Sequence, residues 1–233
     1  MVGSSLAINV LHILREIETV ARATGRDAKD VRLVAVSKTV EAGLVRQACA
    51  LGLKIFGENY VQEWQSKARL LHDCGVEWHL IGALQSNKAK QVVGEVSMIH
   101  SLDRDSLAQA ISKCAVEKGV RQKVLVEVNF AAEESKAGVH AEQAPEQIQA
   151  WAQLPNLNLC GLMVMPPASV NSEDSRPYFR QARVALQQWS RFAQGHDWNE
   201  LSMGTSQDYK VAIAEGATLI RLGTVLFGER PKG

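Results

Sequence analysis

A lysine at the end of an apolar run is the first residue of this sequence whose type and place suggest chemistry. Residues 32–40 read RLVAVSKTV, and the run predicts a buried strand that ends in Ser37 and Lys38. Burying an ammonium group without a partner is costly and lowers its pKa, which leaves a neutral, nucleophilic amine. We therefore expect Lys38 to be desolvated and able to form a Schiff base with an aldehyde.

Two motifs near the end of the chain predict an anion site. LSMGTSQD (201–208) and IRLGT (220–224) supply the glycines Gly204 and Gly223 and the hydroxyls Ser202, Thr205, Ser206 and Thr224. In α/β barrels, phosphate groups bind at the loops after the last two strands, where backbone N–H groups converge. The alternative is structural: Ser206 would be a helix N-cap and Gly223 a turn residue.

An arginine interrupts the apolar strand TLIRLGT. Arg221 cannot easily lose its charge, so inside a strand it needs a hydrogen-bond acceptor. Leu219, Arg221 and Gly223 share one face of the strand, which places the arginine just deeper than a phosphate held at Gly223 and Thr224. An outward Arg221, paired with a carboxylate on a helix, is the alternative.

Together, these three features suggest one type of ligand. It carries an aldehyde for Lys38, a phosphate for the two loops and an aromatic nitrogen for Arg221. Pyridoxal 5′-phosphate (PLP) has all three, and an arginine at its pyridine nitrogen leaves that nitrogen unprotonated and the ring a weaker electron sink. We expect the cofactor to be held firmly rather than strongly activated.

The elements that position these residues alternate along the chain. Eight apolar runs predict strands at 33–37, 54–56, 78–81, 98–102, 124–129, 159–165, 200–203 and 219–222. Helical segments lie between them at 41–51, 61–72, 87–93, 106–118, 144–154, 174–193 and 206–215, with Ser106 and Ser206 as expected caps. The pattern predicts the α/β class and a single (β/α)8 TIM barrel with an extra N-terminal helix, or, as second choice, an open doubly wound sheet.

Composition narrows the class of protein further. No linker divides the 233 residues, so we expect one domain over 1–233, and a net charge of +1 argues against nucleic acid or a membrane surface as partner. Charged residues break up the N-terminal helix, unlike in a signal peptide or membrane span. Four dispersed cysteines without metal-ligand spacing predict free thiols, no metal and a cytoplasmic location: Cys49, Cys74, Cys114 and Cys160.

At this point a family resemblance can be named. AVSKT, FGENYVQE, EWHLIGALQSNKAK, IHSLD, ESKAG, GLMVMP, LSMGTSQD and IRLGTVLFGER, in this order between residues 33 and 230, resemble the pyridoxal phosphate homeostasis proteins. The resemblance implies a barrel similar to the N-terminal domain of alanine racemase and an internal aldimine between PLP and Lys38. It also implies a role in intracellular PLP homeostasis and amino-acid balance, without an established reaction.

The resemblance also implies which residues bind the cofactor. Asn59 would lie beside the ring, Arg221 at the pyridine nitrogen, and Ser202 with Gly223 and Thr224 at the phosphate. Met163 and either His79 or Ile81 would line the pocket. Thr205 departs from the family, which usually has methionine there.

A few further residues have simpler interpretations. Lys136, in ESKAG, matches the family and would hold a loop over the pocket, whereas Glu133 and Glu134 are expected on a solvated face. His100 and His140 have no second ligand nearby in the sequence and are expected to be structural.

Three functions remain open from the sequence. The preferred one is a non-catalytic PLP-binding protein, a monomer that stores PLP or passes it to PLP-dependent apoenzymes. A racemase-type PLP enzyme would need a second acid or base on the ring face opposite Lys38, and nothing shows Tyr60, Tyr178 or Tyr209 there. A Schiff-base aldolase would need no arginine at a pyridine nitrogen.

Overall fold

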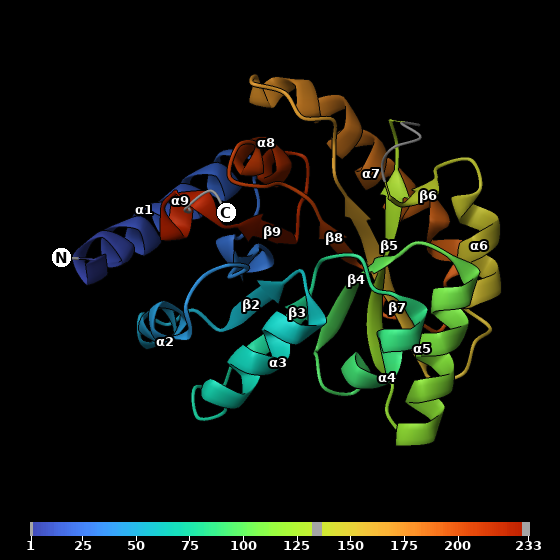
Figure 1. Cartoon of the computed structure of the whole chain (residues 1–233). Helices are drawn as coiled ribbons and strands as arrows, with labels where there is room; N and C mark the ends of the chain where they lie inside the picture. The colour runs from blue at the N-terminus through green and yellow to red at the C-terminus, as the bar shows by residue number, and fades with distance from the viewer. Residues whose placement is uncertain (1, 132–136, 230–233) are drawn as a thin grey trace.

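Eight parallel strands close into a barrel in the computed structural model, which describes residues 2–131 and 137–229 (Figure 1). Around the barrel the strands run β1, β2, β3, β4, β5, β7, β8 and β9, and β9 pairs back to β1. Their bounds are Arg32–Val36, Ile55–Glu58, Glu77–Leu80, Met98–Leu102, Gln122–Asn129, Leu157–Val164, Glu200–Ser202 and Leu219–Leu222. Each contains or overlaps one of the predicted apolar runs, so the predicted barrel is confirmed and the open sheet is excluded.

Alternation along the strands separates an inner from an outer core. Inward side chains fill the barrel with one small apolar cluster, formed by Val34, Ile55, Met98, Leu125, Cys160, Met163 and Leu219. Outward side chains pack against the helices in a much larger cluster. Both faces of a parallel strand are therefore buried, which explains why the strands read as continuous apolar runs.

The helices surround the barrel in the expected order. They are α1 Val2–Ala23, α2 Ala42–Ala50, α3 Val61–Leu70, α4 Ala89–Val92, α5 Asp105–Lys118, α6 Ala144–Trp151, α7 Arg176–Trp189, α8 Tyr209–Ala214 and α9 Thr224–Phe227. The extra helix α1 lies over α8 and α9, where Asn9 Nδ2 donates to the Leu226 carbonyl and Tyr209 OH donates to Glu16. None of the helices in the described ranges is long and apolar enough to cross a membrane.

Three local features differ from the sequence-based expectations. A short strand, β6 (Val139–His140), pairs with β5 outside the barrel. Ser106 lies inside the first turn of α5, and Ser206 precedes α8 by three residues, so neither is an N-cap. Residues 165–175 form a surface loop that ends in a short 3-10 turn at Ser172–Ser175, before α7 begins at Arg176. Of this loop, Met165 lines the cavity at the barrel mouth.

Candidate functional site

A cavity of about 620 Å³ opens at the carboxyl ends of the barrel strands. Among the residues predicted from the sequence, those that line it are Lys38, Asn59, Ile81, Met163, Arg221, Gly223 and Thr224. Three predicted residues, His79, Ser202 and Gly204, are not among its lining residues. The carboxyl ends of barrel strands are the usual place for a functional site, and this cavity collects residues from seven of the eight strands or the loops that follow them.

Lys38 points into this cavity because of its place in strand alternation. Val34 lies in the inner cluster and Val36 lines the cavity, so Ser37 faces outward and Lys38 inward. The lysine is half-buried rather than fully buried. The apolar run suggested stronger desolvation, and the difference arises because Lys38 follows the strand, where the barrel opens.

A buried ion cluster behind the strand fixes the backbone at Lys38. Glu58, fully buried, accepts hydrogen bonds from Ser37 Oγ at 2.6 Å and from Lys67 Nζ at 2.7 Å. Lys67 also donates to the Ser37 carbonyl and to Glu63, which accepts from the Thr39 N–H. Thr39 has φ of +61°, a strained value for threonine, so these bonds hold the turn that follows Lys38.

The burial of Glu58 has an electrostatic consequence. Burial raises the pKa of its carboxyl, and the bonds from Lys67 and Ser37 oppose that shift. Its Oε2 atom has no hydrogen-bond partner within the described part of the chain. We call this cluster of Ser37, Glu58, Glu63 and Lys67 the Lys67 clamp. Its buried carboxylate, Glu58, depends on Lys67 as its counter-ion.

Arg221 lies inside the barrel, as one of the two sequence interpretations required. Its Nη1 donates to Ser202 Oγ at 2.6 Å, and its Nη2 donates to the Val164 carbonyl at 3.0 Å and contacts Met165 Sδ at 2.8 Å. Burial lowers the pKa of the guanidinium to about 10. The alternative, an outward arginine paired with a helix carboxylate, is excluded.

Glu127 is a cavity residue that the sequence interpretation missed. It lies on β5 opposite Met163 of β7, is 9% exposed and lines the cavity. Burial and, to a smaller extent, the negative charge of Asp103 raise the pKa of its carboxyl to about 7, against the opposing effect of Arg221. The sequence did contain a signal for Glu127, because it is a charged residue within the apolar stretch KVLVEVN. The same kind of signal identified Arg221 as a candidate site residue.

The loops after β8 and β9 meet at the other side of the cavity. Thr205, Ser206, Gly223, Thr224 and Val225 line it there. Ser206 Oγ accepts from the Gly223 and Val225 N–H groups at 3.3 and 3.4 Å. Hydroxyls and backbone N–H groups thus converge in one place, as an anion requires.

Ser202 and Gly204, which were predicted to bind the cofactor, lie outside the lining of this cavity. Ser202 is fully buried and pairs with Leu219 in the sheet register, so it lies deeper in the barrel than Gly223 and bonds Arg221 instead. A Cβ on Gly204, where φ is +91°, would lie 2.5 Å from Ala212 Cβ, so this glycine serves the packing of α8. The hydroxyl-bearing residues that line the cavity at these two loops are Thr205, Ser206 and Thr224.

Asn59 and Ile81 enter the cavity from the neighbouring strands β2 and β3. A Cβ on Gly82 would lie 2.4 Å from the Asn59 carbonyl oxygen, so glycine at this position allows the two loops to approach each other. His79, the alternative to Ile81, is fully buried beneath the cavity.

The interpretation of His100 as a lone histidine was wrong. Its Nε2 lies 2.9 Å from Nδ1 of His79, and the rings are 5.0 Å apart. His140 is exposed on β6, and Glu133, Glu134 and Lys136 lie outside the described residues. No group of three His, Cys, Asp or Glu side chains in the described ranges is arranged to hold a metal ion.

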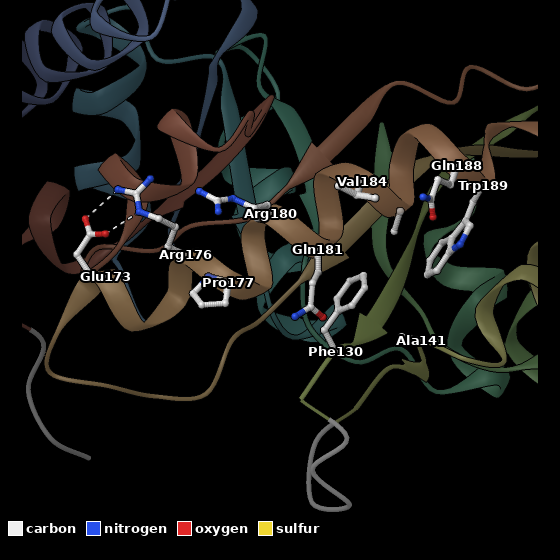
Figure 2. A pocket seen from close by; sticks show the side chains of 11 residues that line it. Phe130, Ala141, Glu173, Arg176, Pro177, Arg180, Gln181, Val184, Gln188 and Trp189 are labelled. Atoms are coloured by element: carbon white, nitrogen blue, oxygen red, sulfur yellow. Dashed lines mark hydrogen bonds and ion pairs between the residues drawn. The ribbon is translucent and has the colours of Figure 1, made fainter.

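A second cavity, of about 700 Å³, lies outside the barrel along α7 (Figure 2). At one end of this cavity Phe130 stacks on Trp189, with ring centroids 6.1 Å apart. At its other end Arg176 is held by Glu173. We call this the α7 groove, and it contains none of the predicted site residues.

Comparison with known proteins agrees with the fold and with the motifs. The family model for the alanine racemase N-terminal domain matches residues 8–231. The structure of alanine racemase from Corynebacterium glutamicum superposes on this chain with a TM-score of 0.65 and 15% sequence identity. The match covers 99% of this chain and 62% of the racemase, and at this identity it supports the fold alone.

Closer relatives cover nearly the whole chain. The pyridoxal phosphate homeostasis protein of Aquifex aeolicus is 45% identical over 94% of this chain and 95% of its own, and that of Pseudomonas aeruginosa is 40% identical over 99% and 98%. PipY of Synechococcus elongatus, solved with PLP bound, is 37% identical, with a TM-score of 0.81 over 91% of this chain and 100% of its own. The chain therefore belongs to the family of pyridoxal phosphate homeostasis proteins.

Proposed function

We propose that this protein binds PLP in the barrel-mouth cavity, holds it through a Schiff base to Lys38, and serves intracellular PLP homeostasis and amino-acid balance. The observation that carries the proposal is the arrangement of three chemically different groups on one cavity. An amine, a buried guanidinium and a set of hydroxyl and N–H donors line the same 620 Å³ space. PLP offers an aldehyde, a ring nitrogen and a phosphate, one for each.

Each group has a separate part in holding the cofactor. Lys38 supplies the nucleophile, and Arg221 supplies N–H groups that can donate a hydrogen bond to the pyridine nitrogen. Ser206, Gly223 and Thr224 supply the donors for the phosphate. Asn59, Ile81 and Met163 line the cavity beside the ring. When bound, PLP would contribute its electron-withdrawing ring, which an arginine at the nitrogen leaves only weakly activating.

The positions of the three tyrosines favour a non-catalytic role over racemisation. Racemisation needs an acid or base on each face of the ring. None of the three tyrosines is among the lining residues found in the described part of the chain, and Tyr209 OH is occupied by a 2.6 Å bond to Glu16. The relatives that cover the full chain carry the name of homeostasis proteins.

We further propose that the protein acts as a monomer in the cytoplasm and supplies PLP-dependent apoenzymes. Its four cysteines are free thiols, which suits a reducing compartment. A net charge of +1 gives no electrostatic attraction to nucleic acid or to an anionic membrane. The mass in solution, measured by light scattering, would test the monomer.

Absorption spectroscopy tests the proposal. Purified protein mixed with PLP should develop a visible band that Lys38→Ala abolishes. No band in the native protein would contradict the proposal. Assays over a panel of amino acids complete the test, because rapid stereoinversion lost in Lys38→Ala would replace the non-catalytic role with racemase chemistry.

A further inference from the structure

A row of polar side chains, buried except at one end, crosses the barrel interior beneath the cavity. Glu77 Oε1 lies 3.1 Å from His79 Nε2, and His79 Nδ1 lies 2.9 Å from His100 Nε2. His100 Nδ1 lies 3.0 Å from Ser202 Oγ, which lies 2.6 Å from Arg221 Nη1. We call these five residues the interior chain. Its members come from β3, β4, β8 and β9, and it joins the cavity to the opposite end of the barrel, where Glu77 is 44% exposed.

The two ends of the interior chain fix the direction of its hydrogen bonds. A guanidinium can only donate and a carboxylate can only accept. His79 therefore donates from Nε2 to Glu77 and, as a neutral ring, accepts at Nδ1. His100 then donates from Nε2 and accepts at Nδ1, so Ser202 donates its proton to His100. With both rings neutral, this is the one arrangement that makes all four bonds.

The surroundings of His100 favour a neutral ring at that position. His79, His100 and Ser202 have no exposed surface. Burial holds the pKa of His100 well below its usual value, and the positive charge of Arg221 acts in the same direction. The hydrogen bond from His79 lowers the pKa of Glu77, which keeps that end an ionised acceptor.

The direction of the chain matters for Arg221. Because Ser202 donates its own proton to His100, the orientation of its hydroxyl is fixed, and a lone pair of its oxygen is held toward the Arg221 guanidinium. Together with the Val164 carbonyl and Met165 sulfur, it engages three of the five N–H groups of Arg221. Within residues 2–131 and 137–229, one N–H on Nη1 and the N–H on Nε form no hydrogen bond and can serve a ligand in the cavity that Arg221 lines.

We propose that His79, His100 and Ser202 are positioning residues for Arg221, and that their one-way chain fixes the hydrogen bond that the arginine offers to the ring nitrogen of the cofactor. This inference rests on the proposed function. A positioning role can be told apart from a purely structural one. If these residues only filled the barrel interior, no particular histidine tautomer would be required and their replacement would not affect the cofactor ring.

Two ligands separate this effect from phosphate binding. Pyridoxal lacks the phosphate of PLP but keeps the ring nitrogen and aldehyde. Ser202→Ala should weaken PLP and pyridoxal alike, by about tenfold for a lost bond to a charged group, and should shift the visible band. Thr224→Ala should weaken PLP alone and leave the band in place.

A matched pair at His100 tests the chain itself. In His100→Asn, the side-chain oxygen can take the place of Nδ1 and still accept from Ser202, so the native band should largely remain. In His100→Leu no acceptor is left, and the band should shift as in Ser202→Ala. A native band and native affinities in Ser202→Ala and His100→Leu would overturn the inference.

The ring tautomers can be measured without cofactor. The ¹⁵N shifts of His79 and His100 in the unliganded native protein should show the proton on Nε2 in both rings. A proton on Nδ1 of either ring would overturn the inference even if the variants fail to fold. If the native protein gives no PLP band, the proposed function fails, and that outcome is distinct from a native protein that binds PLP while Ser202→Ala behaves identically.

Discussion

The barrel-mouth cavity and the α7 groove have similar sizes, about 620 and 700 Å³, and very different charges. In the groove, Arg176 pairs with Glu173 at 2.6 Å, and both are partly exposed. At the barrel mouth, Arg221 and Glu127 are buried, and within the described residues neither forms an ion pair with the other or with a third group. Volume alone therefore does not identify a functional site. Buried charged side chains with unused hydrogen-bond donors or acceptors are a better indicator of a functional site. Burying them costs desolvation energy, which a purely structural role would not require.

The ion clusters near the two cavities should differ most in their contribution to stability. Lys67→Met leaves Glu58 and Glu63 without their cation, and because the lysine is only 7% exposed we expect a loss of about 3–5 kcal/mol in the free energy of unfolding. Arg180→Met, beside the α7 groove, removes an arginine that is 60% exposed and should cost below about 1 kcal/mol. Urea denaturation measures the free energy of unfolding of both variants. Equal losses in the two variants would contradict the expected difference between the clusters.

The buried carboxyl at the barrel mouth should make stability depend on pH. The pKa of Glu127 is raised to about 7, so between its unfolded value and 7 the folded protein binds more protons and loses stability as pH rises. Glu127→Gln should remove this loss and gain up to about 3 kcal/mol over the native protein between about pH 5 and pH 8.

Glu173→Gln, in the α7 groove, is the matched control. The Arg176 guanidinium lowers the pKa of Glu173, so its titration lies below that pH window and the variant should follow the native pH profile. Denaturation at several pH values gives both profiles. A Glu127→Gln profile parallel to that of the native protein would show that the carboxyl is not desolvated.

Hydroxyls at the anion loops should contribute to PLP affinity, whereas polar groups of the α7 groove should not. Ser206→Ala and Thr224→Ala should each weaken PLP binding by about 1–3 kcal/mol, the range for a charge-assisted hydrogen bond. Fluorescence titration with PLP would measure the change. Unchanged retention of PLP in both variants would refute these loops as the phosphate site.

The smallest effect is expected in the α7 groove itself. Gln181→Ala and Val184→Ala change its lining without touching the barrel mouth, so PLP affinity should stay within about 0.5 kcal/mol of native, as for most surface substitutions. A larger loss in the same titration would mean that the groove takes part in binding.

The barrel and its buried arginine were predictable from the sequence because strand alternation is a local pattern. Arg221 stood out as a charge inside an apolar strand, and Glu127 carried the same signal. The sequence did not indicate that Ser202 lies below the cavity, because motif adjacency does not report depth, which depends on the register with β9; nor did it indicate that Gly204 packs against α8. The bond between His79 and His100 joins neighbouring strands, and the Lys67 clamp joins a helix to a strand end, so both depend on tertiary packing that no short motif encodes.

Peptide mapping after borohydride reduction tests the central claim most directly. Native protein incubated with PLP and reduced should carry one pyridoxyl group on the peptide that contains Lys38, and its yield should fall when Arg221 is replaced by methionine. Modification spread over other lysines, with equal yield in Lys38→Ala, would contradict the assignment of this cavity as the cofactor site.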